Sequence, residues 1–163
     1  MTDMNADEQE CQLRNVDVDR LEELAQALVK LLPHRVVIGL RGTLGAGKTR
    51  FAQAFALASG IDQRQVTSPT FTIVQHYQGT RRIHHVDAYR LADEDEFIEL
   101  GGEELLEEDA TILVEWPERI ARCMPDDAVY IDLSVEEDSS KRTVTAICRD
   151  KMLVRCVRQA FSG

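Results

Sequence analysis

One eight-residue stretch constrains the fold of this chain more than any other feature. Residues 42–49 read GTLGAGKT, which fits the pattern G-x-x-x-x-G-K-[ST]. The glycines allow a tight turn in which consecutive backbone N–H groups point inward at the oxygens of a phosphate group. The stretch follows a short apolar run at 36–40 and precedes an amphipathic segment that begins at Lys48. A buried strand, a glycine-rich loop and a helix are therefore predicted in this order.

Each residue type in this loop has a physical role in binding a nucleoside triphosphate. The N–H groups would contact phosphate oxygens, and the positive N-terminal end of the following helix would add to the attraction. The Lys48 ammonium would bridge the β- and γ-phosphates, and the Thr49 hydroxyl would ligate Mg²⁺. The expected nucleotide-binding residues of the loop are Leu44, Gly45, Ala46, Gly47, Lys48 and Thr49. The expected ligands are ATP and Mg²⁺.

Apolar spacing elsewhere predicts one α/β domain of the P-loop NTPase-like class, with a mixed β-sheet flanked by helices. Leucines and alanines recur at spacings of three and four after Asp17 or Asp19, which predicts a helix that Pro33 ends. Further strands are predicted at 71–77 and 82–86 as a hairpin and at 112–114, 129–133 and 143–148, with further helices after Lys48, within 92–109 and near 153–161. We expect a flexible, acidic tail at residues 1–15 and a folded domain at residues 16–163.

Composition argues against several classes of partner. The formal net charge is −10, whereas tight unaided binding to RNA or DNA needs a basic surface. No apolar run approaches the roughly 18 residues that cross a bilayer. The acidic N-terminal region does not have the pattern of a secretory signal, and the four cysteines include no Cys-x-x-Cys pair. We therefore expect a cytoplasmic protein that does not contact a membrane and does not bind a nucleic acid directly and tightly.

Two carboxylates stand where a phosphate loop needs an acid. Glu115 follows the apolar run 111–114, and Asp87 follows 83–86. A buried strand that ends in a carboxylate can place it beside Mg²⁺ or beside an attacking water molecule. Either residue could instead be a solvated carboxylate at a strand end. The residues alone do not divide the two roles between Asp87 and Glu115.

A second loop and two histidines allow more than one interpretation. Residues 67–70 hold three hydroxyls and a proline, which is typical of a switch loop that senses the γ-phosphate or of a simple turn into the hairpin. The pattern alone favours the turn. His84 and His85 are neighbours on a predicted strand, so they point to opposite faces and are not expected to share a metal ion. Trp116, the single tryptophan, is interpreted as an anchor beside Pro117.

Four motifs in order resemble one family. They are GTLGAGKT at 42–49, SPTF at 68–71, HVDAYR at 85–90 and VEWPE at 114–118. Over about residues 17–133 the chain resembles the TsaE family, the small ATPases of bacterial tRNA threonylcarbamoyladenosine synthesis. The first motif alone indicates only a P-loop, but the set together is specific to this family.

The resemblance implies more than the residues alone. Members of the family are single α/β domains whose mixed sheet carries the P-loop, and they bind ATP and Mg²⁺ and hydrolyse ATP weakly alone. They work with the partner proteins TsaB and TsaD, which attach the threonylcarbamoyl group to the adenosine beside the anticodon. The ATPase supports turnover by that complex and does not itself transfer the group. Contact with tRNA would then be indirect, through the partners.

The resemblance also assigns residue roles. Glu115 resembles an Mg²⁺-linked acid of the family, and Asp87 matches an acid that is needed near the metal. Thr70 lies in the family's switch-like loop. The expected catalytic residues are Asp87, Glu115, Lys48 and Thr70, and the expected metal-linked residues are Thr49, Glu115 and Asp87.

Two positions extend or depart from this pattern. The start of the first helix, near Asp17 and Val18, corresponds to a segment that approaches the nucleotide base, so Val18 is an expected nucleotide-binding residue. Family loops often have Asp after the first glycine, where this chain has Thr43. The side chain at this position need not touch phosphate, so we expect little loss. Residues 134–163 match poorly, and their role stays open.

Other nucleotide-binding classes are weighed against this interpretation. A small metabolite kinase usually needs an arginine-bearing lid, and residues 92–110 contain no arginine or lysine. A GTPase would need an Asn-Lys-x-Asp stretch to read guanine, and the chain has none. A nucleotide-gated binding module without significant turnover remains a possible alternative, because it would need the same loop.

Overall fold

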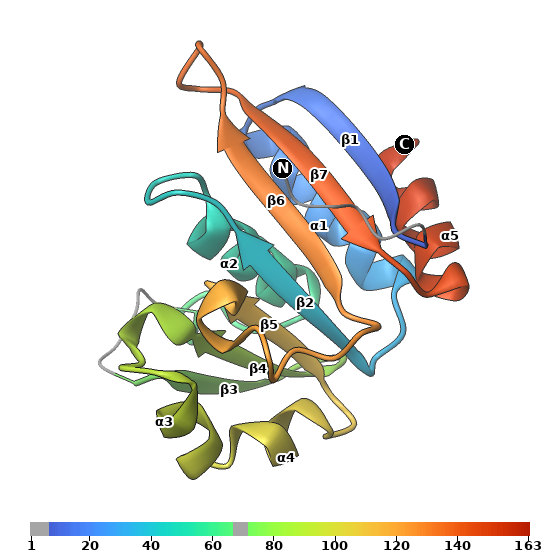
Figure 1. Cartoon of the computed structure of the whole chain (residues 1–163). Coiled ribbons are helices and arrows are strands. Elements are labelled where there is room, and N and C mark those ends of the chain that lie inside the picture. The colour runs from blue at the N-terminus through green and yellow to red at the C-terminus, as the bar shows by residue number, and fades with distance from the viewer. Residues whose placement is uncertain (1–6, 67–71) are drawn as a thin grey trace.

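The computed structural model describes residues 7–66 and 72–163 of the chain. Its strands are β1 (Gln9–Val16), β2 (Val36–Arg41), β3 (Val74–Gln78), β4 (Arg82–Asp87), β5 (Thr111–Glu115), β6 (Val129–Val135) and β7 (Arg142–Cys148). They form one sheet in the order β1-β7-β6-β2-β5-β4-β3 (Figure 1). β2 pairs in parallel with β5 and β6, and β4 pairs in parallel with β5. The β3–β4, β6–β7 and β1–β7 pairs are antiparallel.

Helices cover both faces of this sheet. They are α1 (Val18–Leu31), α2 (Lys48–Ala58), α3 (Glu94–Glu99), α4 (Gly102–Leu106) and α5 (Lys151–Phe161), with 3-10 turns η1 (Ala88–Arg90) and η2 (Pro117–Ile120). The larger core cluster joins α1, α2 and α5 to one face of the sheet, and a smaller cluster joins α3 and η2 to β4 and β5 (Figure 1). The predicted single α/β domain with a mixed sheet flanked by helices is confirmed. No helix in the described part is long and apolar enough to span a membrane.

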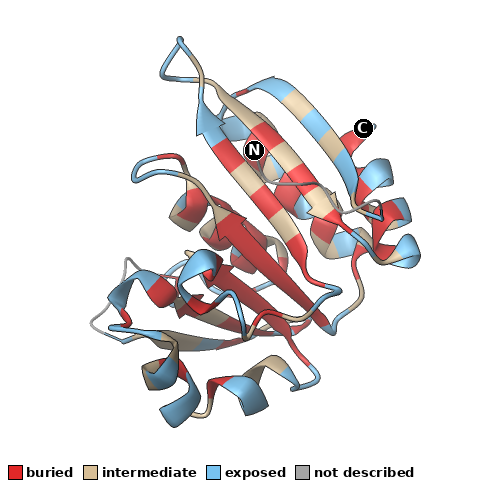
Figure 2. Cartoon of the chain, in the orientation of Figure 1, coloured by how far each residue is buried: buried red, intermediate tan, exposed pale blue. Residues whose placement is uncertain are grey.

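The parallel arrangement brings three strand ends to one edge of the sheet. β2 runs into residues 42–49, β4 ends at Asp87, and β5 ends at Glu115. Every residue of β5 is buried, as are the first five of β2, because both strands lie between covered faces (Figure 2). The edge at which nucleotides bind in such sheets is therefore the edge that carries the predicted site.

The local signals that end and begin helices act as predicted. Asp17, rather than Asp19, caps α1, since its side chain accepts the N–H of Arg20. After α2 the chain turns at Gly60 with φ of 78°, a left-handed conformation that glycine adopts without strain. The hairpin, the helices within 92–109, the two late strands and the closing helix are confirmed, although residue 71 of the first predicted hairpin strand lies outside the described residues.

The predicted tail is wrong for residues 9–15. These residues form most of β1, which pairs antiparallel with β7 from Gln9↔Cys148 to Leu13↔Val144. Cys11 and Leu13 alternate toward the core, while the intervening polar side chains are exposed. β1 is an edge strand with one polar face, so its charged composition resembles that of a tail. Residues 1–6 lie outside the described part of the chain.

Candidate functional site

The loop at residues 42–49 depends on glycine at two positions. Gly42 has φ of 151°, and a Cβ there would lie 2.5 Å from the carbonyl oxygen of Leu133, so a side chain does not fit. Gly47 has φ of 112° and stands at the N-cap of α2, where no side chain caps the first turn. The N-terminal amides of an uncapped helix attract anions. The loop therefore leads into a helix start whose free amides could attract an anion, as the sequence predicts.

The Lys48 ammonium points back into this loop. Its Nζ donates to the carbonyl oxygens of Gly42 at 2.5 Å and Thr43 at 2.9 Å, and it lies 4.0 Å from the centroid of the Trp116 ring. The residue is only 5% exposed. Burial lowers the pKa of Lys48, although the negative charge of Glu115 opposes this shift. The cation is thus held by neutral acceptors that an incoming phosphate group can replace.

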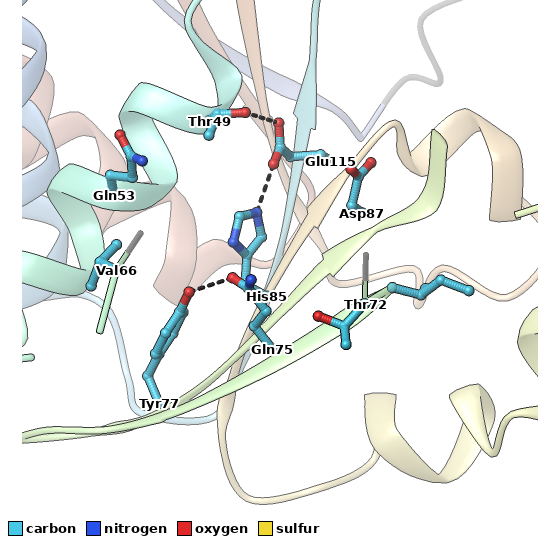
Figure 3. A pocket seen from close by; sticks show the side chains of 10 residues that line it. Thr49, Gln53, Val66, Thr72, Gln75, Tyr77, His85, Asp87 and Glu115 are labelled. Carbon is cyan, nitrogen blue, oxygen red and sulfur yellow. Dashed lines mark hydrogen bonds and ion pairs between the residues drawn. The ribbon is translucent and has the colours of Figure 1, made fainter. Parts of the chain in front are cut away.

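Glu115 is the centre of a buried hydrogen-bonded chain (Figure 3). Its Oε1 accepts the hydroxyl proton of Thr49 at 2.8 Å, and its Oε2 lies 2.7 Å from Nε2 of His85. Glu115 is 6% exposed. Burial by itself would raise the pKa of Glu115, but the hydrogen bond and charge of His85, the Thr49 hydroxyl and the Lys48 charge together hold it below its usual value. The side chain is therefore a carboxylate at neutral pH, and His85 Nε2 is the donor.

Asp87 lies beside Glu115 because the two residues are in register across β4 and β5. One Asp87 oxygen accepts the N–H of Tyr89 at 3.2 Å, and the other pairs with Nε of Arg90 at 3.2 Å. A cavity of about 20 Å³ is lined by Thr49, His85, Asp87 and Glu115 among others (Figure 3). This volume can hold about one water molecule. Both predicted acids therefore line one small cavity of mixed polar and apolar character next to the first turn of α2.

The oxygen atoms in this cluster suit a magnesium ion. Mg²⁺ prefers hard oxygen ligands in octahedral geometry, in which adjacent ligand atoms are about 2.9 Å apart. The Thr49 hydroxyl and the nearer Glu115 oxygen are 2.8 Å apart. A carboxylate of Asp87 is available on the neighbouring strand. Thr49, Glu115 and Asp87 thus bring oxygen atoms, the ligand type that Mg²⁺ prefers, to the same edge of the sheet.

Two predicted residues, Leu44 and Val18, do not join this cluster. Leu44 is 74% exposed at the tip of the loop, so only its backbone is placed to serve a ligand. Val18, the first residue of α1, is 46% exposed. Thr70 and the rest of the SPTF motif at 68–71 lie outside the described residues.

His85 is a residue of the site that the sequence interpretation missed. It lies two positions before Asp87 on β4, and residues two apart on a strand share a face. Because Asp87 is itself a candidate site residue, the sequence also indicates that His85 faces the site. His84 lies on the opposite face, as predicted, and contacts Nδ1 of His76 at 2.6 Å and Glu108 at 2.7 Å.

Trp116 does more than anchor the chain beside Pro117, because its ring lies over the Lys48 ammonium. Its φ is 59°, a left-handed conformation that is uncommon for residues other than glycine and is often found at functional sites. This turn directly follows β5 and sets the indole ring over the Lys48 ammonium and 5.1 Å from the ring of Tyr89. No local sequence pattern indicates this backbone conformation.

Comparisons with known proteins identify the family of this chain. The sequence model of the family described as Threonylcarbamoyl adenosine biosynthesis protein TsaE matches residues 16–144. The tRNA threonylcarbamoyladenosine biosynthesis protein TsaE of Treponema pallidum is 38% identical over 117 residues, which are 72% of this chain and 86% of that protein. The protein of the same name from Bacillus subtilis is 35% identical over 136 residues, 82% of this chain and 84% of that protein.

A solved structure shows the same fold. The crystal structure of Bacillus subtilis YdiB matches with a TM-score of 0.75 and 25% sequence identity, over 94% of this chain and 95% of that chain. The family match extends through β6 into β7, beyond the four motifs that carry the resemblance in the sequence. With the family match and these relatives, the chain belongs to the TsaE family.

Proposed function

We propose that this protein binds MgATP at residues 42–49 and hydrolyses it slowly, in support of tRNA threonylcarbamoyladenosine biosynthesis. The process is the one named for its relatives from Treponema pallidum and Bacillus subtilis. The main support for an ATP site is the hydrogen-bonded chain from Thr49 through Glu115 to His85, which lies next to a glycine-rich loop. A loop that only connected a strand to a helix would not need a buried carboxylate directed at its threonine.

The proposed mechanism is electrostatic. On nucleotide binding, the Lys48 ammonium exchanges the carbonyls of Gly42 and Thr43 for phosphate oxygens, and the loop N–H groups contact the same phosphates. Thr49 and Glu115 would hold Mg²⁺, which supplies positive charge against the β- and γ-phosphates when bound. The hydrogen bond from His85 orients Glu115 for this task.

Asp87 is the residue that we assign to the attacking water. Its carboxylate lines the water-sized cavity and is fixed by Arg90 and by the N–H of Tyr89. A carboxylate oxygen that is held in this way can accept a hydrogen bond from water and orient its lone pair. The division of roles is therefore Glu115 for metal and Asp87 for water.

Slow turnover by the isolated protein follows from what the cavity lacks. None of the described residues that line it is an arginine, and Arg90 beside it is already paired with Asp87. A guanidinium that stabilises the transferring phosphoryl group raises the rates of such sites by about 10³-fold or more. We propose that the TsaB and TsaD proteins complete the site, and that an acidic protein of net charge −10 reaches tRNA only through them.

The experiment that tests this function measures phosphate release from ATP with and without TsaB and TsaD, for wild type, Lys48→Ala and the surface variant Arg149→Ala. We expect slow release that the partners increase, no release above background with Lys48→Ala, and wild-type behaviour with Arg149→Ala. Transfer of the γ-phosphate to a small molecule would instead identify a kinase. Partner binding that depends on nucleotide but releases no phosphate would identify a nucleotide-gated module.

A further inference from the structure

Arg142 contacts the loop at residues 42–49 although it lies 96 positions after Ala46 in the sequence. It is the first residue of β7, and its side chain donates from Nε to the carbonyl of Ala46 at 2.7 Å and from Nη2 to the carbonyl of Gly45 at 3.1 Å. Its Nη1 donates to the carbonyls of Ser139 at 2.7 Å and Lys141 at 3.1 Å. The half-buried guanidinium is thus bound through all three nitrogens to backbone carbonyls, two of which belong to the loop.

These contacts set the direction of two peptide groups in the loop. In a trans peptide the C=O and N–H bonds point in opposite directions, and the described chain has no cis peptide. The Ala46 carbonyl points to Arg142, so the N–H of Gly47 points away from it. The Gly45 carbonyl also points to Arg142, so the N–H of Ala46 points away from it. This N–H donates to the carbonyl oxygen of Thr43 at 3.0 Å and closes a turn within the loop.

The tip of the loop, at Leu44 and Gly45, has little packing around it to hold its conformation. Gly45 has φ of 79°, and a Cβ built on it would meet nothing within 4 Å. Leu44 beside it is largely exposed. Glycines in open space have many backbone conformations available, so an unsupported loop loses entropy when it binds a ligand. A rigid donor that holds the carbonyls restricts the loop before the ligand binds, so less conformational entropy is lost on binding.

Arg142 is itself held firmly. β7 lies between β1 and β6, and Arg142 is in register with Val16 on one side and Val135 on the other. Its guanidinium is permanently charged, and its planar donor groups suit two successive carbonyls. It also places a positive charge beside a phosphate site in a protein whose net charge is −10.

We propose that Arg142 is a positioning residue of the nucleotide site, which fixes the orientation of the peptide groups of residues 45–47 before nucleotide binds. The proposal rests on the proposed function, because it requires that the loop bind nucleotide. Arg142 does not have to touch the nucleotide. It acts through the peptide groups of Gly45 and Ala46.

The test compares ATP and ADP affinities of wild type, Arg142→Ala and Arg142→Lys by calorimetry. Arg149→Ala is the matched control, because Arg149 follows the other end of β7 and also donates through Nε and Nη2, to Glu8. We expect Arg142→Ala to weaken both affinities at least tenfold, Arg142→Lys to weaken them less, and Arg149→Ala to stay within twofold of wild type. Binding of ATP to Arg142→Ala within twofold of wild type would overturn the proposal.

Chemical rescue separates positioning from a general structural role. Guanidinium ion, added to Arg142→Ala far below denaturing concentrations, should restore part of the ATP affinity and return the amide NMR signals of residues 45–47 toward their wild-type positions. If the variant binds weakly, melts at a lower temperature and is not rescued, Arg142 serves only the fold and the proposal is wrong. Failure of wild type itself to bind ATP would overturn the proposed function together with this inference, whereas equal binding by wild type and variant would overturn this inference alone.

Discussion

The two halves of the sheet differ in burial and in what they contribute to the site. In the parallel half, which holds β2, β5 and β4, the strands β2 and β5 are buried almost throughout. The polar residues of the site lie near or just beyond the strand ends. In the antiparallel half, β6 and β7 alternate between buried and more exposed residues, and β1 is mostly exposed (Figure 2). The first half carries the groups proposed to meet the nucleotide, and the second supports the loop from outside through Arg142.

The difference follows from how each half meets water. A strand buried on both faces has room for charged groups only where they are paired, as Glu115 is with Thr49 and His85. A strand with one wet face can carry long polar side chains at little cost. Changes in the parallel half should therefore alter chemistry, and changes in the antiparallel half should alter stability unless they reach the loop.

The largest effect is expected from Lys48→Ala in the parallel half. Removing the ammonium that stabilises charge on the phosphates should lower the rate of ATP hydrolysis by about 10²- to 10³-fold. Phosphate release at saturating ATP measures this loss. Retention of the wild-type rate by a folded Lys48→Ala protein would show that the loop is not the reacting site.

The next effect is expected from Asp87→Asn and Glu115→Gln. Each change keeps the side-chain shape and removes the charge, so turnover should fall by about 10²-fold while ATP affinity changes much less. Only Glu115→Gln should raise the Mg²⁺ concentration needed for half-maximal rate, because Glu115 is assigned to metal. Steady-state kinetics with varied ATP and Mg²⁺ separate the two roles, and equal losses of affinity and turnover would argue against both assignments.

A smaller effect is expected from His85→Ala. His85 orients Glu115 but is not expected to touch the nucleotide itself. Losing such a supporting contact should lower the rate of ATP hydrolysis by about 10- to 100-fold. His84→Ala is a matched control on the opposite face of the same strand, where it should alter stability but not the rate per folded molecule. Equal rate losses in the two variants would show that the His85 contact has no special role.

A core change in the antiparallel half should leave the chemistry intact. Val144 of β7 is fully buried, and Val144→Ala should lower the free energy of unfolding by about 2 kcal/mol through lost apolar contact. Urea denaturation measures this loss, and the ATPase rate per folded molecule should stay at the wild-type value. A large fall in that rate would mean that the two halves are coupled more tightly than the comparison assumes.

The smallest effect concerns Cys148 at the end of β7. Burial raises the pKa of its thiol to about 11, so the neutral thiol is favoured by folding and little reactive thiolate exists near neutral pH. Below the unfolded pKa this preference adds to stability, and the contribution is lost as the pH rises through about 11. Alkylation at pH 8, followed by mass spectrometry, should label Cys148 more slowly than the half-buried Cys11. Equal labelling rates would show that β1 and β7 separate readily.

Local patterns predict most of the parallel half. Gly42 and Gly47, the apolar runs of β2 and β5, and the carboxylates that end β4 and β5 are all visible in stretches of fewer than ten residues. Each is dictated by local backbone geometry or by burial on both faces. The prediction of β1 failed because an edge strand with one polar face becomes stable only through its pairing with β7, far along the chain.

The missed site residues depend on contacts between distant segments. His85 reaches Glu115 across 30 positions, and Arg142 reaches Ala46 across 96. Neither contact leaves a periodic signal, although the shared face of His85 and Asp87 offered a partial one. The left-handed backbone of Trp116 is uncommon for residues other than glycine, so it could not be inferred from residue type.

Calorimetric titration of ATP with and without Mg²⁺, for wild type and Thr49→Val, tests the central claim most directly. The Thr49 hydroxyl donates to Glu115, and valine keeps the shape of threonine without the oxygen. We predict that Mg²⁺ strengthens ATP binding to wild type and that Thr49→Val loses most of this increase while it remains folded. If ATP binding were equally strong with and without Mg²⁺ in both proteins, the edge that joins residues 42–49, Asp87 and Glu115 would not be a MgATP site.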